Sequence, residues 1–169
     1  MHNNPLAFLI TFRTYGTWLP GDPRGSVNKN HNTFGEPSAP PSRNLEQHSR
    51  NALKHAPVEL DSELRSCVQR AIKAVCEHRN WALPAINVRS NHVHTVVAAD
   101  RHPNRVMLDF KAWSTRRLRE HGLMDHNTTV WARHGSTKYL FDECSVAEAV
   151  RYVRDEQDGP RFEGSVPTR

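Results

Sequence analysis

The segment "WALPAINVRSNHVHTVVAA", residues 81–99, holds two short runs of strand-forming residues with the polar tripeptide Arg-Ser-Asn between them. The second run, 92–99, is rich in valine, which is typical of a strand. Pro84 weakens the prediction for the first half of the first run, because proline cannot donate a hydrogen bond to a neighbouring strand. The short polar gap predicts that the strands over 81–88 and 92–99 form a hairpin.

Strand and helix signals flank this hairpin on both sides. The stretch "LAFLITFRTYGTW", residues 6–18, alternates with a period of two, which predicts a strand with its phenylalanines on one face. Apolar residues at helical spacing predict a helix before the hairpin, over 61–78, and a second helix after it, over 103–120.

The C-terminal part of the chain adds one strand and one helix. Residues 128–141 contain a strand, either in one piece or in two short pieces about Gly135. Ser145 and Glu148 have the spacing of a capping box, which predicts that the last helix starts there. We expect this helix to end near Gln157, before a glycine and a proline.

The resulting order, β-α-β-β-α-β-α, predicts an α+β fold of the ferredoxin-like (RRM-like) type, a split βαβ antiparallel sheet with an added C-terminal helix. The two earlier helices are expected on one face of the sheet, which leaves the other face for the last helix or a ligand. We expect one domain over 1–160, with a long polar loop at about 19–57 and a tail over 161–169.

Charge and cysteine content narrow the class of partner and the compartment. The chain has 169 residues and a formal net charge of +5, which favours a polyanion such as nucleic acid and no membrane partner. Cys67, Cys76 and Cys144 show no CxxC spacing, so we interpret them as reduced thiols in the core. No targeting segment is visible, and the expected location is cytoplasmic.

His92 and His94 stand two residues apart in the second strand of the hairpin. Residues at i and i+2 of a strand point to the same side, so the two imidazoles are neighbours while Val93 faces the packed side. Such a pair can supply two ligands to a divalent metal, or it can be a pair of half-exposed histidines. Metal-binding HxH pairs also occur in cupins and amidohydrolase barrels, but the helices argue against a cupin and the length against a barrel.

The last helix offers candidates for a third metal ligand. Tyr152 and Glu156 are an i, i+4 pair and share a side at the edge of the apolar stripe, where they would face the sheet. Gln157 falls nearer the centre of the stripe and is the alternative ligand. Taken alone, Tyr152 fits an aromatic residue that packs its ring and exposes its hydroxyl.

Five motifs along the chain together resemble a known family. They are "TYGTWLPGDPRGSV" (14–27), "NHVH" (91–94), "FKAWSTRRL" (110–118), "VWARHGSTKYL" (130–140) and "EAVRYVRDEQ" (148–157). In this order they resemble the REP-associated tyrosine transposases, which are HUH single-tyrosine nucleases related to the transposases of the insertion-sequence 200/605 type. HUH denotes histidine, bulky hydrophobe, histidine, and the matching residues here are His92, Val93 and His94.

The resemblance implies a metal-dependent single-stranded DNA endonuclease and strand transferase that acts through a covalent phosphotyrosine. Tyr152 matches the nucleophile, His92 and His94 match the metal ligands, and Glu156 matches the offset of the third ligand. Many relatives carry asparagine or glutamine at that place, so the carboxylate is a departure and Gln157 stays open as the ligand. The expected cofactor is Mg²⁺ or Mn²⁺; two imidazoles favour manganese or another transition metal.

The expected partner is single-stranded or hairpin DNA, bound by a monomer or a homodimer. Single-stranded DNA needs cations along its backbone and flat groups for its bases, and two groups of side chains are candidates for such contacts. The first group lies on the helix over 103–120 and comprises Arg105, Lys111, Arg116, Arg117 and Arg119. The second lies in and before the long loop and comprises Arg13, Trp18, Arg24 and Lys29.

Two other functions fit parts of the pattern. A domesticated relative would bind DNA or RNA hairpins without turnover, although the aromatic residues of an RRM are missing from strand 92–99. Two histidines with Glu156 also match the 2-His-1-carboxylate triad of an iron oxygenase. The basic charge and the resemblance favour the nuclease.

Overall fold

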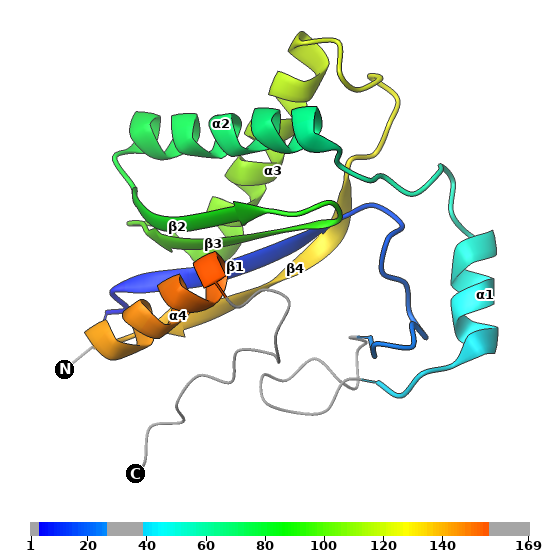
Figure 1. Cartoon of the computed structure of the whole chain (residues 1–169), viewed down its shortest axis with the longest axis horizontal. Coiled ribbons are helices and arrows are strands. Elements are labelled where there is room, and N and C mark those ends of the chain that lie inside the picture. Colours follow the sequence, from blue (N-terminus) through cyan, green and yellow to red (C-terminus); the bar gives the residue numbers. More distant parts are fainter. Residues whose placement is uncertain (1–3, 27–38, 156–169) are drawn as a thin grey trace.

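The computed structural model describes residues 4–26 and 39–155. The regular elements, in chain order, are β1 (Ala7–Thr14), α1 (Arg43–Asn51), α2 (Ser62–Arg79), β2 (Ala82–Val88), β3 (His92–Ala98), α3 (Pro103–Glu120), β4 (Trp131–Leu140) and α4 (Glu143–Asp155). The four strands form one sheet in the order β2-β3-β1-β4, and every neighbouring pair is antiparallel (Figure 1). The ferredoxin-like split βαβ prediction is therefore confirmed, and so is the hairpin of β2 and β3.

The two faces of the sheet carry two separate cores. Helices α2 and α3 cover one face, and α4 covers the other (Figure 1). Phe8, Ile10 and Phe12 pack into the larger core on the α2–α3 side. Leu9, between them in sequence, packs against α4 in the smaller core. The period-two alternation of β1 thus assigns successive side chains to opposite layers, as predicted.

Side chains at the helix ends explain most of the observed boundaries. The Asp61 side chain caps α2 by accepting a hydrogen bond from the Leu64 amide, which agrees with the predicted start. The predicted start of α4 at a Ser145–Glu148 capping box is wrong. Helix α4 begins at Glu143, because the Asp142 carboxylate accepts hydrogen bonds from the amide and the hydroxyl of Ser145.

Helix α1 was not expected, because it lies inside the segment 19–57 that the sequence predicts as a polar loop. None of its residues is buried, so it has no apolar stripe for the sequence to reveal. Local contacts support it: the Ser42 hydroxyl accepts from the Leu45 amide, and Arg50 pairs with Glu46 one turn away. Figure 1 shows α1 apart from the sheet, with an extended connection that leads from it to α2.

Strand β4 is one continuous strand that includes Gly135. Its register with β1 shifts between Phe12 and Thr14. A Cβ at Gly135 would lie 2.5 Å from the Thr11 carbonyl oxygen and 2.6 Å from the Met107 sulfur. Glycine is needed there because β1, β4 and α3 approach closely, not because the strand breaks.

Two of the three cysteines are core thiols, as predicted. Cys67 and Cys76 are buried on α2, whereas Cys144 is exposed at the start of α4, so the prediction for Cys144 is wrong. Among the described helices, none combines the length and hydropathy needed to cross a membrane.

Candidate nuclease site

The two histidines lie side by side on the α4 face of the sheet. Val93, between them, is fully buried in the core on the α2–α3 face, so the imidazoles point the opposite way. Their ring centroids are 4.7 Å apart. In the register of β3 with β1, His94 lies opposite Thr11 and His92 lies opposite Arg13.

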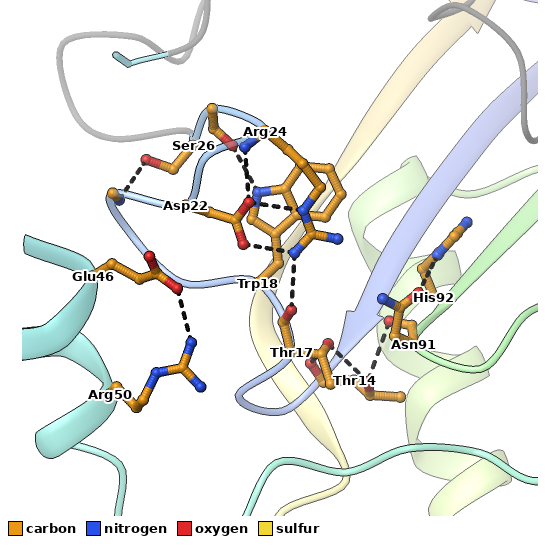
Figure 2. Close-up of polar contacts among 12 residues, drawn as sticks. Thr14, Thr17, Trp18, Asp22, Arg24, Ser26, Glu46, Arg50, Asn91 and His92 are labelled. Carbon is orange, nitrogen blue, oxygen red and sulfur yellow. Dashed lines mark hydrogen bonds and ion pairs between the residues drawn. The ribbon is translucent and has the colours of Figure 1, made fainter. Parts of the chain in front are cut away.

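An oxygen atom engages the Nδ1 atom of each imidazole. His92 Nδ1 lies 2.6 Å from the Asn91 side-chain oxygen, and His94 Nδ1 lies 2.6 Å from the Thr11 hydroxyl (Figure 2 shows the Asn91–His92 pair). An amide oxygen only accepts, so His92 Nδ1 donates and the lone pair of that ring is on Nε2. Thr11 gives His94 the same tautomer when its hydroxyl accepts from Nδ1. Second-shell bonds of this kind orient histidine ligands of metals.

His94 is held in its neutral form. Its side chain is buried in the smaller layer, and only 8% of the residue is exposed. The pKa of His94 is lowered to about 3, first by burial and then by the electrostatic influence of His92, Arg13 and Arg89. A neutral imidazole is the form that binds a metal, so the surroundings of His94 keep it ready for that role at neutral pH.

Tyr152 projects from α4 toward the same histidine. Its ring centroid is 5.5 Å from that of His94, with the two rings edge to face. Its helix neighbour Val153 is buried against the sheet, and β2 holds the end of α4 through two backbone carbonyls. Asn87 donates to the Val153 carbonyl at 3.1 Å, and Arg154 donates to the Pro84 carbonyl at 2.9 Å.

The structure thus brings Tyr152, His92 and His94 together, as the sequence predicts. The candidate third ligands Glu156 and Gln157 lie outside the described residues, as does Lys29. Within residues 4–26 and 39–155, no cluster of three or more histidine, cysteine or acidic side chains is placed to bind a metal. The described part of the chain therefore supplies two imidazoles to any metal site.

Three residues of this site were not among the predicted ones: Thr11, Asn87 and Asn91. Thr11 and Asn87 flank His94 in the register of the neighbouring strands. The signal that could have found them is a polar residue at an inward position of an otherwise apolar strand, in β1 and in β2. Reading that signal requires the register between strands, which a single sequence does not provide.

Comparison with known proteins shows the family to which this chain belongs. Residues 45–156 match the family model described as transposase, IS200-like, and this segment contains both histidines and Tyr152. The chain belongs to the IS200-like transposase family. No match was found among curated proteins.

Two solved structures resemble the fold of this family member. One is a REP-associated tyrosine transposase bound to a REP hairpin, with a TM-score of 0.51, 12% identity and 89% of the present chain covered. The present chain spans 65% of that protein, and the likeness shows a common fold. The other is a candidate transposase from Deinococcus radiodurans R1, with a TM-score of 0.47, 13% identity and 93% of each chain covered.

The basic residues of α3 lie on the opposite side of the sheet from the two histidines and Tyr152. Arg105, Arg116 and Arg117 are exposed on this helix, and Arg119 is half-buried with a bond to the Thr128 carbonyl at 3.3 Å. Because α3 covers the face opposite the histidines, these side chains cannot line the same surface as Tyr152.

Lys111 was predicted to contact DNA from α3, but its ammonium lies in the protein interior. It donates to the Ala132 carbonyl at 2.9 Å and to the His134 carbonyl at 3.2 Å, and burial lowers its pKa. In this structure Lys111 joins α3 to β4.

The predicted loop residues Arg13, Trp18 and Arg24, in contrast, do lie near the histidine pair. Arg13 is the cross-strand neighbour of His92, and both arginines contact the Trp18 ring. Of the two groups predicted to bind DNA, the loop group is therefore the one beside the candidate nuclease site.

Asn87→Ala is expected to loosen the end of α4 that carries Tyr152. The substitution removes the bond to the Val153 carbonyl, which we expect to lower the free energy of unfolding by about 1 kcal/mol. Hydrogen exchange should accelerate at the amides of the last turn of α4, measured by mass spectrometry. Asn127→Ala, in an exposed turn, is the matched control. Unchanged exchange in α4 would contradict an anchoring role for Asn87.

Proposed function

We propose that this chain is a transposase-like nuclease and strand transferase that cleaves and rejoins single-stranded DNA through Tyr152. The observation that carries the proposal is the edge-to-face approach of the Tyr152 and His94 rings beside His92. Membership of the IS200-like family supports DNA as the substrate. The hairpin bound in the structural relative supports DNA with a hairpin as the form that is recognised.

The donor set fits a divalent cation, Mg²⁺ or Mn²⁺. Both Nδ1 atoms are engaged by oxygen atoms, which leaves the Nε2 atoms of His92 and His94 as ligands. We propose Glu156, with Gln157 as the alternative, as the third ligand. A bound cation would neutralise charge on the non-bridging oxygens of the scissile phosphate.

Tyr152 would act as the nucleophile in two successive transfers. In the first, its phenolic oxygen forms a bond to phosphorus, the P–O3′ bond breaks, and the leaving 3′-oxygen takes up a proton. In the second, a 3′-hydroxyl attacks the phosphotyrosine, the bond between phosphorus and the tyrosine oxygen breaks, and a new phosphodiester forms. The energy of the broken linkage is kept in the protein–DNA ester, so rejoining needs no ATP.

The two groups of basic residues would serve different parts of the DNA. Arg13, Trp18 and Arg24 lie beside the histidine pair and would contact the reacting strand. Lys29, outside the described residues, stays a candidate for the same role. The exposed arginines of α3, on the opposite layer, would contact DNA away from the reacting phosphate. We further propose that residues 1–160 act as one domain, as a monomer or homodimer, in the cytoplasm.

A covalent-adduct assay tests this function. The protein is incubated with end-labelled hairpin DNA that carries single-stranded flanks, with Mn²⁺, with Mg²⁺ or with chelator, and separated on a denaturing gel. We expect a labelled band at the mass of protein plus DNA, lost with chelator and restored by either metal. Binding without an adduct would favour the hairpin-binding module instead, and an adduct that ignores chelator would remove the histidines from a metal role.

A further inference from the structure

Two arginines enclose the indole ring of Trp18 beside the histidine pair. The Cζ atom of Arg13 lies 3.3 Å from the ring centroid, and the Cζ atom of Arg24 lies 4.0 Å from it. One face of an indole has no room for two guanidinium groups at such distances, so the arginines lie on opposite faces. Cation–π attraction favours each contact, but the two positive charges repel each other, so something must hold them there.

Asp22 holds the outer arginine of this stack. Its carboxylate accepts from Arg24 Nε at 2.7 Å and from an Arg24 terminal nitrogen at 2.6 Å, and the same nitrogen donates to the Thr17 carbonyl (Figure 2). Asp22 is buried, and its hydrogen bonds with Arg24 lower its pKa, so it stays ionised. The charge of Arg24 is therefore offset within the loop, and its Nε atom and one terminal nitrogen donate to protein acceptors.

The indole is fixed from its edge as well. Trp18 Nε1 donates to the Gly25 carbonyl at 2.7 Å, which ties the ring plane to the same loop. The loop thus supports the indole through its edge and through one face, and Arg13 lies on the face opposite Arg24. Such a support reduces the rotamer entropy that a long side chain loses when it binds a ligand.

Arg13 lies where β1 leaves its regular pairing with β4. The register of β1 with β4 shifts between Phe12 and Thr14, so Arg13 lies at the irregularity. On its other side it lies opposite His92, on the face where Thr11 contacts His94. Irregular strand positions of this kind redirect a side chain, often next to a functional site.

We propose that Arg13 binds the DNA phosphate at the His92–His94 site, and that Trp18, Asp22 and Arg24 are positioning residues that hold its guanidinium there. This inference rests on the proposed function for the identity of the ligand. Stacking uses the face of a guanidinium, whereas phosphate binds its N–H edge, so Arg13 can do both at once. In this proposal the main role of Arg24 is to hold Trp18 from the opposite face of the ring.

Substitutions along the stack test the proposal with two readouts, the rate of adduct formation and the affinity for hairpin DNA. Arg13→Gln is expected to slow adduct formation by about 100-fold, which is the usual cost of one donor to a developing charge. Affinity should fall by less than about 10-fold, because other cations still contact the strand. Arg101→Gln, at the opposite end of β3, removes the same charge and should change neither readout.

Substitutions at Trp18 distinguish a role in positioning Arg13 from a general effect on folding. Trp18→Phe keeps a flat ring under Arg13 and should retain most of the rate, whereas Trp18→Leu should lose as much as Arg13→Gln. In the Arg13→Gln background, Trp18→Leu should cost nothing further, because the two residues act as one unit. Additive losses in the double variant would overturn the positioning role, and melting temperatures would identify any variant that fails to fold.

For Asp22→Asn, the proposal predicts slower adduct formation, whereas the loss of one negative charge alone would favour DNA binding. Removing an acidic group from a DNA-binding surface ordinarily strengthens DNA binding. The stack instead predicts slower adduct formation, because Arg24 loses its charged partner and Trp18 its support. Faster adduct formation, or an Arg13→Gln variant that matches Arg101→Gln, would overturn the inference while the proposed function stands.

A wild-type protein that forms no adduct would refute the proposed function but still leave Arg13 testable. In chelator, the dependence of affinity on salt counts phosphate contacts, at about 0.7 in log–log slope for each contact to a single strand. Arg13→Gln and Trp18→Leu should each reduce this slope by about 0.7, the value for one phosphate contact. An unchanged slope would overturn the inference whether or not the chain cleaves DNA.

Discussion

Tyr152→Phe is expected to abolish the covalent protein–DNA adduct while hairpin binding survives. The substitution keeps the ring that packs against His94 and the smaller core, and it removes only the hydroxyl that attacks phosphorus. Loss of a nucleophile costs about 10⁴-fold or more in rate, so no labelled band should remain on a denaturing gel. Affinity, measured by anisotropy with a fluorescent hairpin, should match that of the wild type.

Tyr139→Phe is the matched control for this prediction. Tyr139 is 39% exposed on β4, and its hydroxyl contacts His102 at the surface. It packs on Phe8 on the α2–α3 side, away from the histidine pair. An adduct that persists in Tyr152→Phe would reject Tyr152 as the nucleophile, and loss of the adduct in Tyr139→Phe would assign the attack elsewhere.

His94→Gln is expected to have the second largest effect, a loss of about 1,000-fold in adduct formation. The substitution removes a neutral, buried imidazole from the proposed metal site and leaves an amide, which is a weaker ligand than imidazole for a transition metal. Thr11→Val, which keeps the imidazole but removes the oxygen at its Nδ1 atom, should weaken metal binding by about 10- to 100-fold. Mn²⁺ titration followed by electron paramagnetic resonance would measure both.

The comparison between His94→Gln and Thr11→Val is informative because Mn²⁺ binding should weaken more in the first variant than in the second. An exposed histidine, His126, provides the control, and His126→Gln should leave Mn²⁺ binding unchanged. If His94→Gln and Thr11→Val weaken binding equally, the orienting role of Thr11 is wrong. If neither weakens it, the metal lies elsewhere.

The sequence predicts the parts of this molecule that depend on local periodicity. The hairpin, the shared face of His92 and His94, and the bounds of α3 all follow from spacings of two or about 3.6 residues. Helix α1 could not be predicted this way, because it buries no residue and depends on a cap and one ion pair. The predicted start of α4 differs from the observed one because Asp142 and Ser145 are both residues that commonly cap helices. Only the folded structure shows that Asp142 is the one that caps α4.

Contacts between segments distant in the sequence account for the remaining differences between the predictions and the structure. A helical projection places Lys111 among the arginines of α3, but it cannot show the two β4 carbonyls that bind its ammonium. In the same way, the motif of residues 14–27 predicts a basic, aromatic loop, while the enclosure of Trp18 between Arg13 and Arg24 appears only in three dimensions. The pairings that give these residues their roles join segments that are not neighbours in the chain.

The placement of α3 and α4 on opposite faces of a single sheet has an evolutionary consequence. Under the proposed function, side chains of α3 would help to select the DNA hairpin. They can be substituted without disturbing Tyr152 and the two imidazoles on the opposite face of the sheet. A lineage could therefore acquire a new target, or lose its chemistry and remain a hairpin reader, by substitutions confined to one side. Under the proposed function, the sheet would lie between the side chains that select DNA and those that break it.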